Sequence, residues 1–171
     1  MKAIVAVDKN WGIGYKGALL ERIPEDMKFF KSLTVGKVVV MGRETFESLP
    51  GRKLLPDRVN IIISTKMKAD EVPEGAVICN SLEQLFEVLK QYPDEDIYVI
   101  GGASIYRQLL PYCHEVYVTR FSNTHTADAF FPNLDNEQGW RMEVINDNLC
   151  HNNLKYDRVK YINESVIKWD M

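Results

Sequence analysis

The stretch IYVIGGASIYRQLLP, residues 97–111, contains a strand, a glycine pair and a helix in immediate succession. Residues 97–100 predict a buried strand, and residues 103–110 predict a helix that Pro111 ends. Glycines at the carboxyl end of a strand let backbone N–H groups at the following helix approach a phosphate. A glycine pair is also common in simple tight turns, so this stretch predicts an α/β fold but does not by itself predict a function.

A second stretch repeats this order. Residues 37–41 predict a β-branched strand, Gly42-Arg43 follows it, and residues 45–49 predict a short helix. A guanidinium is well suited to binding phosphate. Two such stretches indicate a dinucleotide site.

The remaining pattern completes a mostly parallel sheet. Further strands are predicted at residues 2–7, 59–64, 76–79 and 115–121, and helices at residues 24–33 and from the capping pair Ser81 and Gln84 to about residue 91. The tail differs, because residues 140–144 and 154–162 read as strands with no helix between them. This predicts an antiparallel hairpin closing the sheet.

Composition excludes several classes of protein. The chain has 171 residues, of which 46% are hydrophobic and 26% charged, which is typical of one globular domain. Its 21 basic and 24 acidic residues are interspersed, so no basic stripe is available for nucleic acid. No run approaches the ~20 apolar residues of a membrane span. Cys79, Cys113 and Cys150 form no C-x-x-C pair, which argues against a disulfide framework or a zinc site and suits the cytoplasm.

Residues 12–17, GIGYKG, match the G-x-G-x-x-G pattern of dinucleotide-binding folds. That fingerprint must open a helix, yet Trp11 separates it from the preceding strand and residues 18–24 do not form an immediate amphipathic helix. A loop spanning residues 10–23 is long for a compact domain, where such loops are usually functional. A mobile active-site flap is therefore the better interpretation.

Asp26 is the first candidate for a catalytic residue. Its position in the first turn of a helix starting at Pro24 is typical of a carboxylate that only complements the helix dipole. It also shares a face with Phe30 and Leu33, where a carboxylate beside apolar side chains could bind an amidine-like edge with both oxygens. Three histidines lack ligand spacing and are expected at surface positions: His114, His125 and His151.

Together these stretches resemble dihydrofolate reductase. The motifs are WGIG at residues 11–14, IPEDM at 23–27, VMGRETF at 40–46 and VIGGA at 99–103, continuing through LPDR at 55–58, YVT at 117–119 and FFP at 130–132. The resemblance covers residues 2 to about 132, and the last 40 residues match only in strand pattern. It implies a single α/β domain over residues 1–171, with an eight-stranded, predominantly parallel (mixed) sheet, an antiparallel C-terminal hairpin and about four flanking helices.

The resemblance also implies NADPH-dependent reduction of 7,8-dihydrofolate to tetrahydrofolate, with hydride passing to C6 and a proton to N5. Asp26 would bind the pyrimidine edge of the pterin and support protonation of N5, and Thr119 would hydrogen-bond that carboxylate. Arg58 would clamp the glutamate α-carboxylate, a bidentate task suited to arginine. The other substrate-binding residues implied are Ile4, Val5, Met27, Phe30, Lys31, Leu49, Leu55, Ile100 and Tyr106.

For the cofactor, Gly101, Gly102 and Ala103 match the pyrophosphate turn. Arg43, Thr65 and Lys66 suit the 2′-phosphate, which favours NADPH over NADH, although Ser104 stands where some relatives place an arginine. No metal is expected. The other cofactor-binding residues implied are Ala6, Ile13, Gly14, Gly42, Glu44, Thr45, Ser64, Ile100 and Ile105.

The chain departs from the family at Leu20-Glu21, where relatives usually have Pro-Trp. Since that indole contacts the substrate and an ordered water, we expect Glu21 to alter flap closure, the water path or the affinity for antifolate inhibitors, with activity retained. The resemblance also implies that the protein is a cytoplasmic monomer that acts on small molecules.

Two other functions remain open from the residues alone. A reductase of a pyrimidine intermediate in riboflavin synthesis has a similar architecture and cofactor, but lacks the acid-bearing helix pattern. A non-catalytic nucleotide-binding module would keep the glycine turns, but has no reason to combine Asp26 with Thr119 and Arg58.

Overall fold

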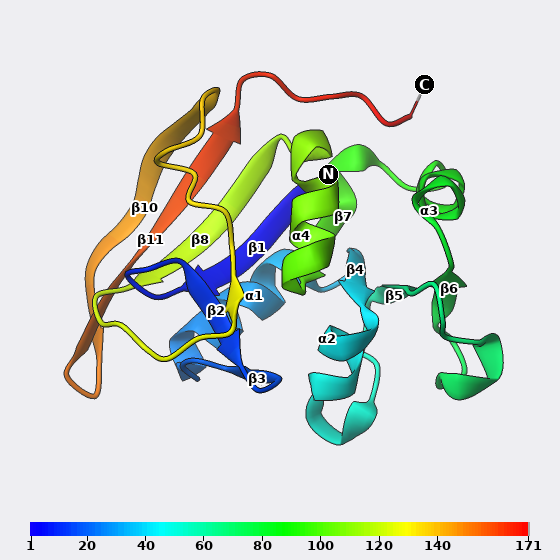
Figure 1. Ribbon diagram of the computed structural model, residues 1–171, viewed down its shortest axis with the longest axis horizontal. Helices are drawn as coiled ribbons and strands as arrows, with labels where there is room; N and C mark the ends of the chain where they lie inside the picture. Colours follow the sequence, from blue (N-terminus) through cyan, green and yellow to red (C-terminus); the bar gives the residue numbers. More distant parts are fainter. Residues whose placement is uncertain (171) are drawn as a thin grey trace.

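Eight strands form the central sheet of the computed structural model, which describes residues 1–170 (Figure 1). Their order is β10-β11-β8-β1-β7-β4-β5-β6, and all neighbouring pairs are parallel except β11 with β8 and β10 with β11. The predicted mixed sheet with its antiparallel C-terminal hairpin is therefore confirmed. The strands are β1 (Lys2–Val7), β4 (Val38–Gly42), β5 (Val59–Ile63), β6 (Val77–Cys79), β7 (Ile97–Gly101), β8 (Glu115–Phe121), β10 (Trp140–His151) and β11 (Leu154–Asn163).

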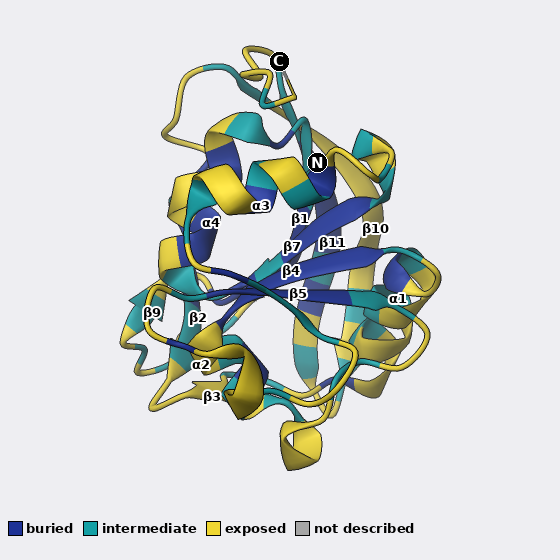
Figure 2. Ribbon diagram, turned by 90° about the vertical axis from the view of Figure 1, so that its right-hand side faces the viewer, coloured by how far each residue is buried: buried dark blue, intermediate teal, exposed yellow. Residues whose placement is uncertain are grey.

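Helices cover both faces of this sheet. Figure 2 shows α3 and α4 on one side of the buried central strands and α1 and α2 on the other. The alternation of strand side chains explains this, because every second residue points to the same face. In β4, Val38 and Val40 pack in the core beneath α3 and α4, whereas Val39 and Met41 pack against α2. The helices are α1 (Pro24–Thr34), α2 (Arg43–Ser48), α3 (Leu82–Leu89) and α4 (Ala103–Leu109).

The segment at residues 10–23 is more regular than predicted. It contains β2 (Gly12–Tyr15) and β3 (Ala18–Leu19), which join β9 (Ala129–Phe130) in a separate three-stranded sheet of order β3-β2-β9. The prediction of an unbroken loop was wrong. Such short strands depend on partners distant in the sequence, so no local pattern announces them.

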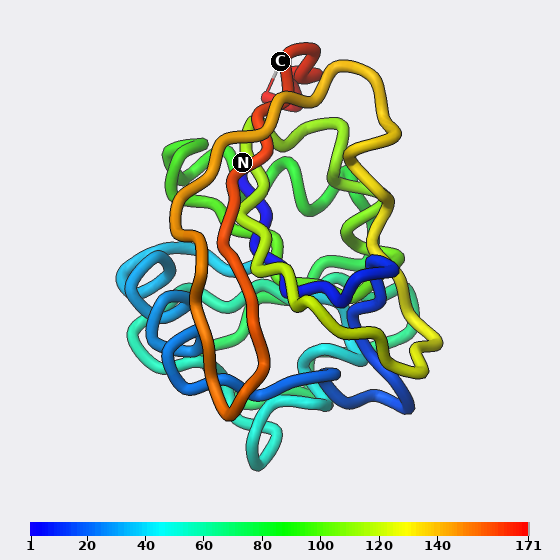
Figure 3. The backbone as a smooth tube through the Cα atoms, turned by 90° about the vertical axis from the view of Figure 1, so that its left-hand side faces the viewer, coloured from blue at the N-terminus to red at the C-terminus, as the bar shows by residue number. Residues whose placement is uncertain are grey.

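Two predicted boundaries were also wrong. Helix α2 begins at Arg43 rather than at residue 45, and β10 continues to His151 rather than ending at residue 144. Residues 146–148 are polar and do not read as a strand, but the pairs Asn146–Arg158 and Leu149–Tyr156 on either side of a register shift keep this segment in the sheet. Figure 3 shows β10 and β11, in orange and red, side by side at the edge of the sheet.

Asp94, which lies in a short 3₁₀ turn, Asp94–Asp96, contacts both the N-terminus and Trp169. Asp94 Oδ1 lies 2.5 Å from the N-terminal nitrogen of Met1 and accepts a hydrogen bond from Trp169 Nε1 at 2.7 Å. His114 Nδ1 lies 3.3 Å from Asp94 Oδ2. Burial opposes ionisation of Asp94, but the hydrogen bonds from the N-terminal ammonium and Trp169, together with nearby positive charge, lower its pKa overall.

No helix within residues 1–170 combines the length and the apolar character that crossing a membrane requires.

Candidate active site

The two strand-glycine-helix stretches lie next to each other. Strands β4 and β7 are parallel neighbours with Met41 opposite Gly101, so α2 and α4 begin at the same edge of the sheet. Gly101 has a φ of 125°, and a Cβ there would lie 3.2 Å from Thr45 Oγ1. A Cβ at Gly42 would lie 2.9 Å from Ile105 Cγ1. Only glycine fits at these positions, and the backbone here forms a cradle that suits a pyrophosphate.

Asp26 and Thr119 are brought together from distant parts of the chain. Pro24 opens α1 at its first position, which places Asp26 in the first turn. Thr119 lies on β8, only 4% exposed, and its Oγ1 donates a hydrogen bond to Asp26 Oδ1 at 2.5 Å. The structure thus places this predicted pair in contact.

Arg158 is a partner of Asp26 that the sequence did not reveal. It lies on β11 directly opposite Thr119, and its Nη2 donates to the same Oδ1 of Asp26 at 3.3 Å. The motifs that indicated the site end near residue 132, and only the register of β11 against β8 brings residue 158 to Asp26. Burial does not alternate cleanly along β11, since Arg158 and its neighbour Val159 are both buried, so no local pattern could have indicated this arginine.

Arg58 is prepared for an anionic ligand. Its guanidinium carbon lies 5.8 Å from the centre of the Phe30 ring, and its Nε is buried without a hydrogen-bond partner among residues 1–170. Burial lowers the pKa of Arg58. Asn60, which was not predicted from the sequence, holds the preceding turn in place. Its Oδ1 accepts a hydrogen bond from the Leu55 N–H at 3.0 Å, and its Nδ2 donates one to the Arg58 carbonyl at 3.1 Å.

The other predicted substrate residues fall into two groups. Tyr106 is buried and donates its hydroxyl to the Ile4 carbonyl at 2.7 Å, which joins α4 to β1 beside Val5. By contrast, Met27 is 49% exposed and Lys31 is also exposed on α1. Three partly buried residues pack on the cluster around Met41 and Phe46: Leu49, Leu55 and Ile100.

A model of the dihydrofolate reductase family matches residues 1–163. The chain belongs to this family. It is similar to the dihydrofolate reductase of Drosophila melanogaster, with 36% identity over 140 residues that cover 75% of this chain and 77% of the relative. It is also similar to those of Buchnera aphidicola (37% over 138 residues, 81% and 82% covered) and Bacillus subtilis (35% over 139 residues, 81% and 79% covered). The resemblance inferred from the motifs is confirmed, and with it the family's oxidoreductase activity and its cofactor, NADPH.

The predicted 2′-phosphate residues of this family member follow two neighbouring strands at the same edge of the sheet, because Gly42 at the end of β4 is paired with Ile63 at the end of β5. Arg43 Nε donates to Glu47 Oε1 at 2.8 Å, and Thr65 and Lys66 are exposed after β5. Ser64 Oγ shapes the turn there by accepting from the backbone N–H groups of Lys66 and Met67 at 3.3 and 3.2 Å. Two further predicted cofactor residues, Glu44 and Ser104, are also exposed to solvent, whereas Gly102 and Ala103 are partly buried.

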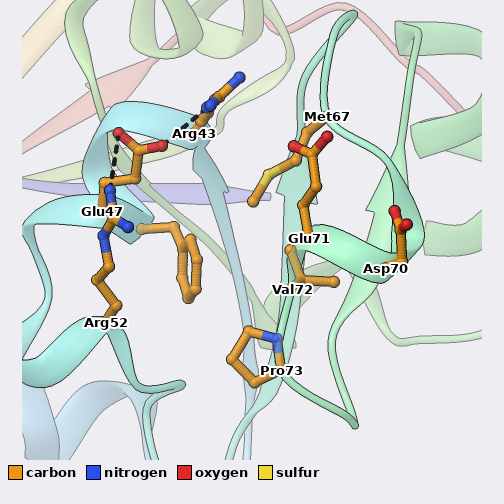
Figure 4. Close-up of a pocket in the computed structure, with 9 residues that line it drawn as sticks. Arg43, Glu47, Arg52, Met67, Asp70, Glu71, Val72 and Pro73 are labelled. Carbon is orange, nitrogen blue, oxygen red and sulfur yellow. Dashed lines mark hydrogen bonds and ion pairs between the residues drawn. The ribbon is translucent and has the colours of Figure 1, made fainter.

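A cavity of about 430 Å³ is lined by Arg43, the residue that follows Gly42 of the glycine cradle, and its lining does not include Asp26. Figure 4 shows Glu47 between Arg43 and Arg52, with the carboxylates of Asp70 and Glu71 on the opposite wall. The lining carries the three carboxylates of Glu47, Asp70 and Glu71 against the two guanidinium groups of Arg43 and Arg52, so an anion inside it would meet charges of both signs. The glycine cradle is the part of the structure that suits the pyrophosphate of the cofactor.

The flap is tied to the connection between β8 and β9. Asp8 Oδ1 accepts from the Gly12 N–H at 2.8 Å, and its Oδ2 accepts from the His125 N–H at 2.8 Å. Glu21, the departure from the family pattern, lies with Oε1 2.9 Å from His125 Nε2 and 3.3 Å from Asn123 Nδ2. Sequence reasoning identified Glu21 but neither Asp8 nor these partners. Two cofactor predictions, Ile13 and Gly14, lie in this flap, and Ala6 lies on β1 near it.

The histidines are less exposed than surface positions imply. His114, His125 and His151 are 28–29% exposed, and each lies within 3.5 Å of a carboxylate, those of Asp94, Glu21 and Glu25. The prediction of surface histidines was therefore only approximate, since each contributes to a local ion pair or hydrogen bond.

Proposed function

We propose that Asp26 is the residue that anchors the pterin of dihydrofolate while the ring is reduced. The observation that carries this proposal is the hydrogen bond from Thr119 Oγ1 to Asp26 Oδ1 at 2.5 Å. Because Thr119 and Arg158 both contact Oδ1, the carboxylate is held in one orientation. Within residues 1–170 no group donates a hydrogen bond to Oδ2, so that oxygen is free to accept an N–H of the pyrimidine edge.

Hydride transfer to C6 must be matched by a proton at N5. When bound, the reduced nicotinamide of NADPH supplies the hydride. Asp26 would contact the far edge of the pterin rather than N5, so the proton arrives through a water molecule that the flap admits. Asp8 accepts hydrogen bonds from the N–H groups of Gly12 and His125, and the Lys16 N–H donates to Asp128. These contacts hold that flap against the β8–β9 connection.

Arg58 and Phe30 fix the other end of the substrate. A guanidinium binds a carboxylate through two parallel hydrogen bonds, and the buried Nε of Arg58 has such a hydrogen bond to give. The ring of Phe30 beside it would face the aromatic linker of the folate. Met27, Lys31, Leu49 and Leu55 would form the rest of this wall.

For NADPH, the cradle of Gly42, Gly101 and Gly102 would hold the pyrophosphate with backbone N–H groups, assisted by Thr45 Oγ1. Arg43 and Lys66 would provide positive charge for the 2′-phosphate. Comparing NADPH with NADH tests this assignment, because Arg43→Met and Lys66→Met should each weaken only the NADPH-dependent rate.

The activity is tested by mixing purified protein with NADPH and dihydrofolate and following the loss of reduced-nicotinamide absorbance. We expect turnover that yields tetrahydrofolate. Failure to consume NADPH with folded protein would overturn the assignment, and turnover that survives Asp26→Asn unchanged would overturn the role of Asp26.

We further propose that residues 1–171 act as one domain, as a monomer, in the cytoplasm, and that antifolates with an amidine edge compete with dihydrofolate at Asp26. The three free cysteines suit a reducing compartment. Size-exclusion chromatography with light scattering tests the monomer, and a dimer at micromolar concentration would contradict it.

A further inference from the structure

Arg158 places a positive charge directly beside the proposed pterin anchor. Its side chain is 9% exposed, and that of Asp26 is 21% exposed. Since Arg158 stands opposite Thr119 in the β8–β11 register, both side chains reach α1 from the same face of the sheet. Arg158 Nη2 lies 3.3 Å from Asp26 Oδ1, the oxygen that Thr119 also contacts.

Two further contacts hold this guanidinium in place. Its central carbon lies 4.1 Å from the centre of the Phe29 ring, within the range of a cation–π interaction. Its Nη1 donates to Asn146 Oδ1 at 3.1 Å. Arginine keeps its proton in proteins, and a charge that is largely buried is screened little by salt. The positive charge beside Asp26 is therefore permanent and fixed.

This charge affects different ligands of Asp26 differently. A 2-amino-4-oxo pyrimidine edge, as in dihydrofolate, is neutral and offers the carboxylate hydrogen bonds only. A 2,4-diaminopyrimidine edge can bind a proton and then offers the carboxylate a full positive charge. That second cation would lie close to the guanidinium of Arg158, where like charges repel. Specificity of this kind comes from a repulsive group as well as an attractive one.

We propose that Arg158 is a specificity-determining residue that weakens the binding of cationic 2,4-diaminopyrimidine ligands relative to neutral 2-amino-4-oxo ligands at Asp26. This inference rests on the proposed role of Asp26 as the pterin anchor. Arg158 thus shapes which compounds can occupy the site.

Folate and aminopterin form a matched pair of probes, because they differ at the pyrimidine edge only by a 4-oxo or a 4-amino group. Their dissociation constants are measured by titration calorimetry for the parent, Arg158→Met, Arg158→Gln and Arg158→Lys. We expect the preference for aminopterin over folate to increase about tenfold or more in the Met and Gln variants, because the repulsion is removed. In Arg158→Lys, which keeps the charge, it should stay within about threefold of the parent.

The matched control is Arg120→Met. Arg120 is the next residue along β8, and it donates to Asp157 on β11 through Nε at 2.9 Å and Nη2 at 2.7 Å. Removing it deletes an ion pair between the same two strands without touching Asp26. We expect the ligand preference to stay within about threefold of the parent, even if the melting temperature falls.

An unchanged preference in a folded Arg158→Met or Arg158→Gln variant would overturn the inference, as would an equal change in Arg120→Met. Both neutral variants, Arg158→Met and Arg158→Gln, are tested because one of them still decides the question if the other does not fold. Failure of the proposed function would give a different result: the Asp26→Asn variant would then bind folate as tightly as the parent does. If folate binding depends on Asp26 while the preference ignores Arg158, only the role of Arg158 fails.

Discussion

Thr119→Val replaces the hydroxyl that contacts Asp26 with a methyl group of similar size. Hydrogen bonds to charged groups contribute about 1.5–3 kcal/mol. We expect the lower end, because the Asp26 side chain is 21% exposed and Arg158 still contacts the same oxygen at 3.3 Å. Since about 1.4 kcal/mol corresponds to a factor of ten, kcat/KM for dihydrofolate should fall about tenfold.

Steady-state kinetics with saturating NADPH measure this change, and Thr34→Val is the matched control. Thr34 is fully buried on α1 and donates its Oγ1 to the Phe30 carbonyl at 2.9 Å, so the same atoms are removed without contact to Asp26. The control should lose about 1 kcal/mol of stability but keep its kcat/KM. The reasoning is refuted if folded Thr119→Val keeps kcat/KM within about twofold of the parent, or if Thr34→Val loses as much.

Three further predictions concern the substrate tail, the flap and the chain termini. Arg58→Met should raise KM for dihydrofolate about tenfold or more and leave KM for a pterin without the glutamate unchanged. Arg52→Met, at an exposed arginine, is the control and should change neither KM. An equal rise in KM for both substrates in Arg58→Met would contradict the carboxylate clamp. Glu21→Trp should change antifolate affinity and the pH–rate profile, because it removes the contacts with His125 and Asn123, and unchanged values would count against a role for Glu21 in the flap. Asp94 has a pKa below its ordinary 3.8, so its contribution to stability is present above that pH and is lost as pH falls through the lowered value. Thermal unfolding should therefore show Asp94→Asn less stable than the parent near neutral pH but converging with it in acid, and a gap that stays constant would argue against the ion pair.

Much of the sheet could be predicted because its signals are local. Residues 97–111 contain their own strand, turn and helix signals, and the structure places β7, Gly101-Gly102 and α4 there. Strand β1 and strand β8 have the predicted bounds for the same reason, since β1 is an apolar run and β8 is rich in the β-branched and aromatic residues that favour strands. The short strands β2, β3 and β9 carry no such signal, because their structure depends on each other.

Only those site residues that lie within a recognisable motif could be predicted from the sequence. Asp26 and Thr119 each lie in a recognisable motif, and their contact followed from the resemblance. Arg158 lies beyond those motifs, and its contact with Asp26 depends on the register between β8 and β11, which a single sequence does not specify. Likewise, Glu21 was visible as a departure, but its partner His125 lies about a hundred residues away along the chain.

The central claim is that the carboxylate of Asp26 anchors the pterin during reduction, and single-turnover hydride transfer in Asp26→Asn tests it most directly. Asparagine keeps the shape and one oxygen but removes the negative charge. The rate of reduced-nicotinamide loss at saturating dihydrofolate should fall about a hundredfold or more, with Asp26→Glu retaining a larger share of it. A folded Asp26→Asn variant that transfers hydride within about threefold of the parent rate would contradict the claim.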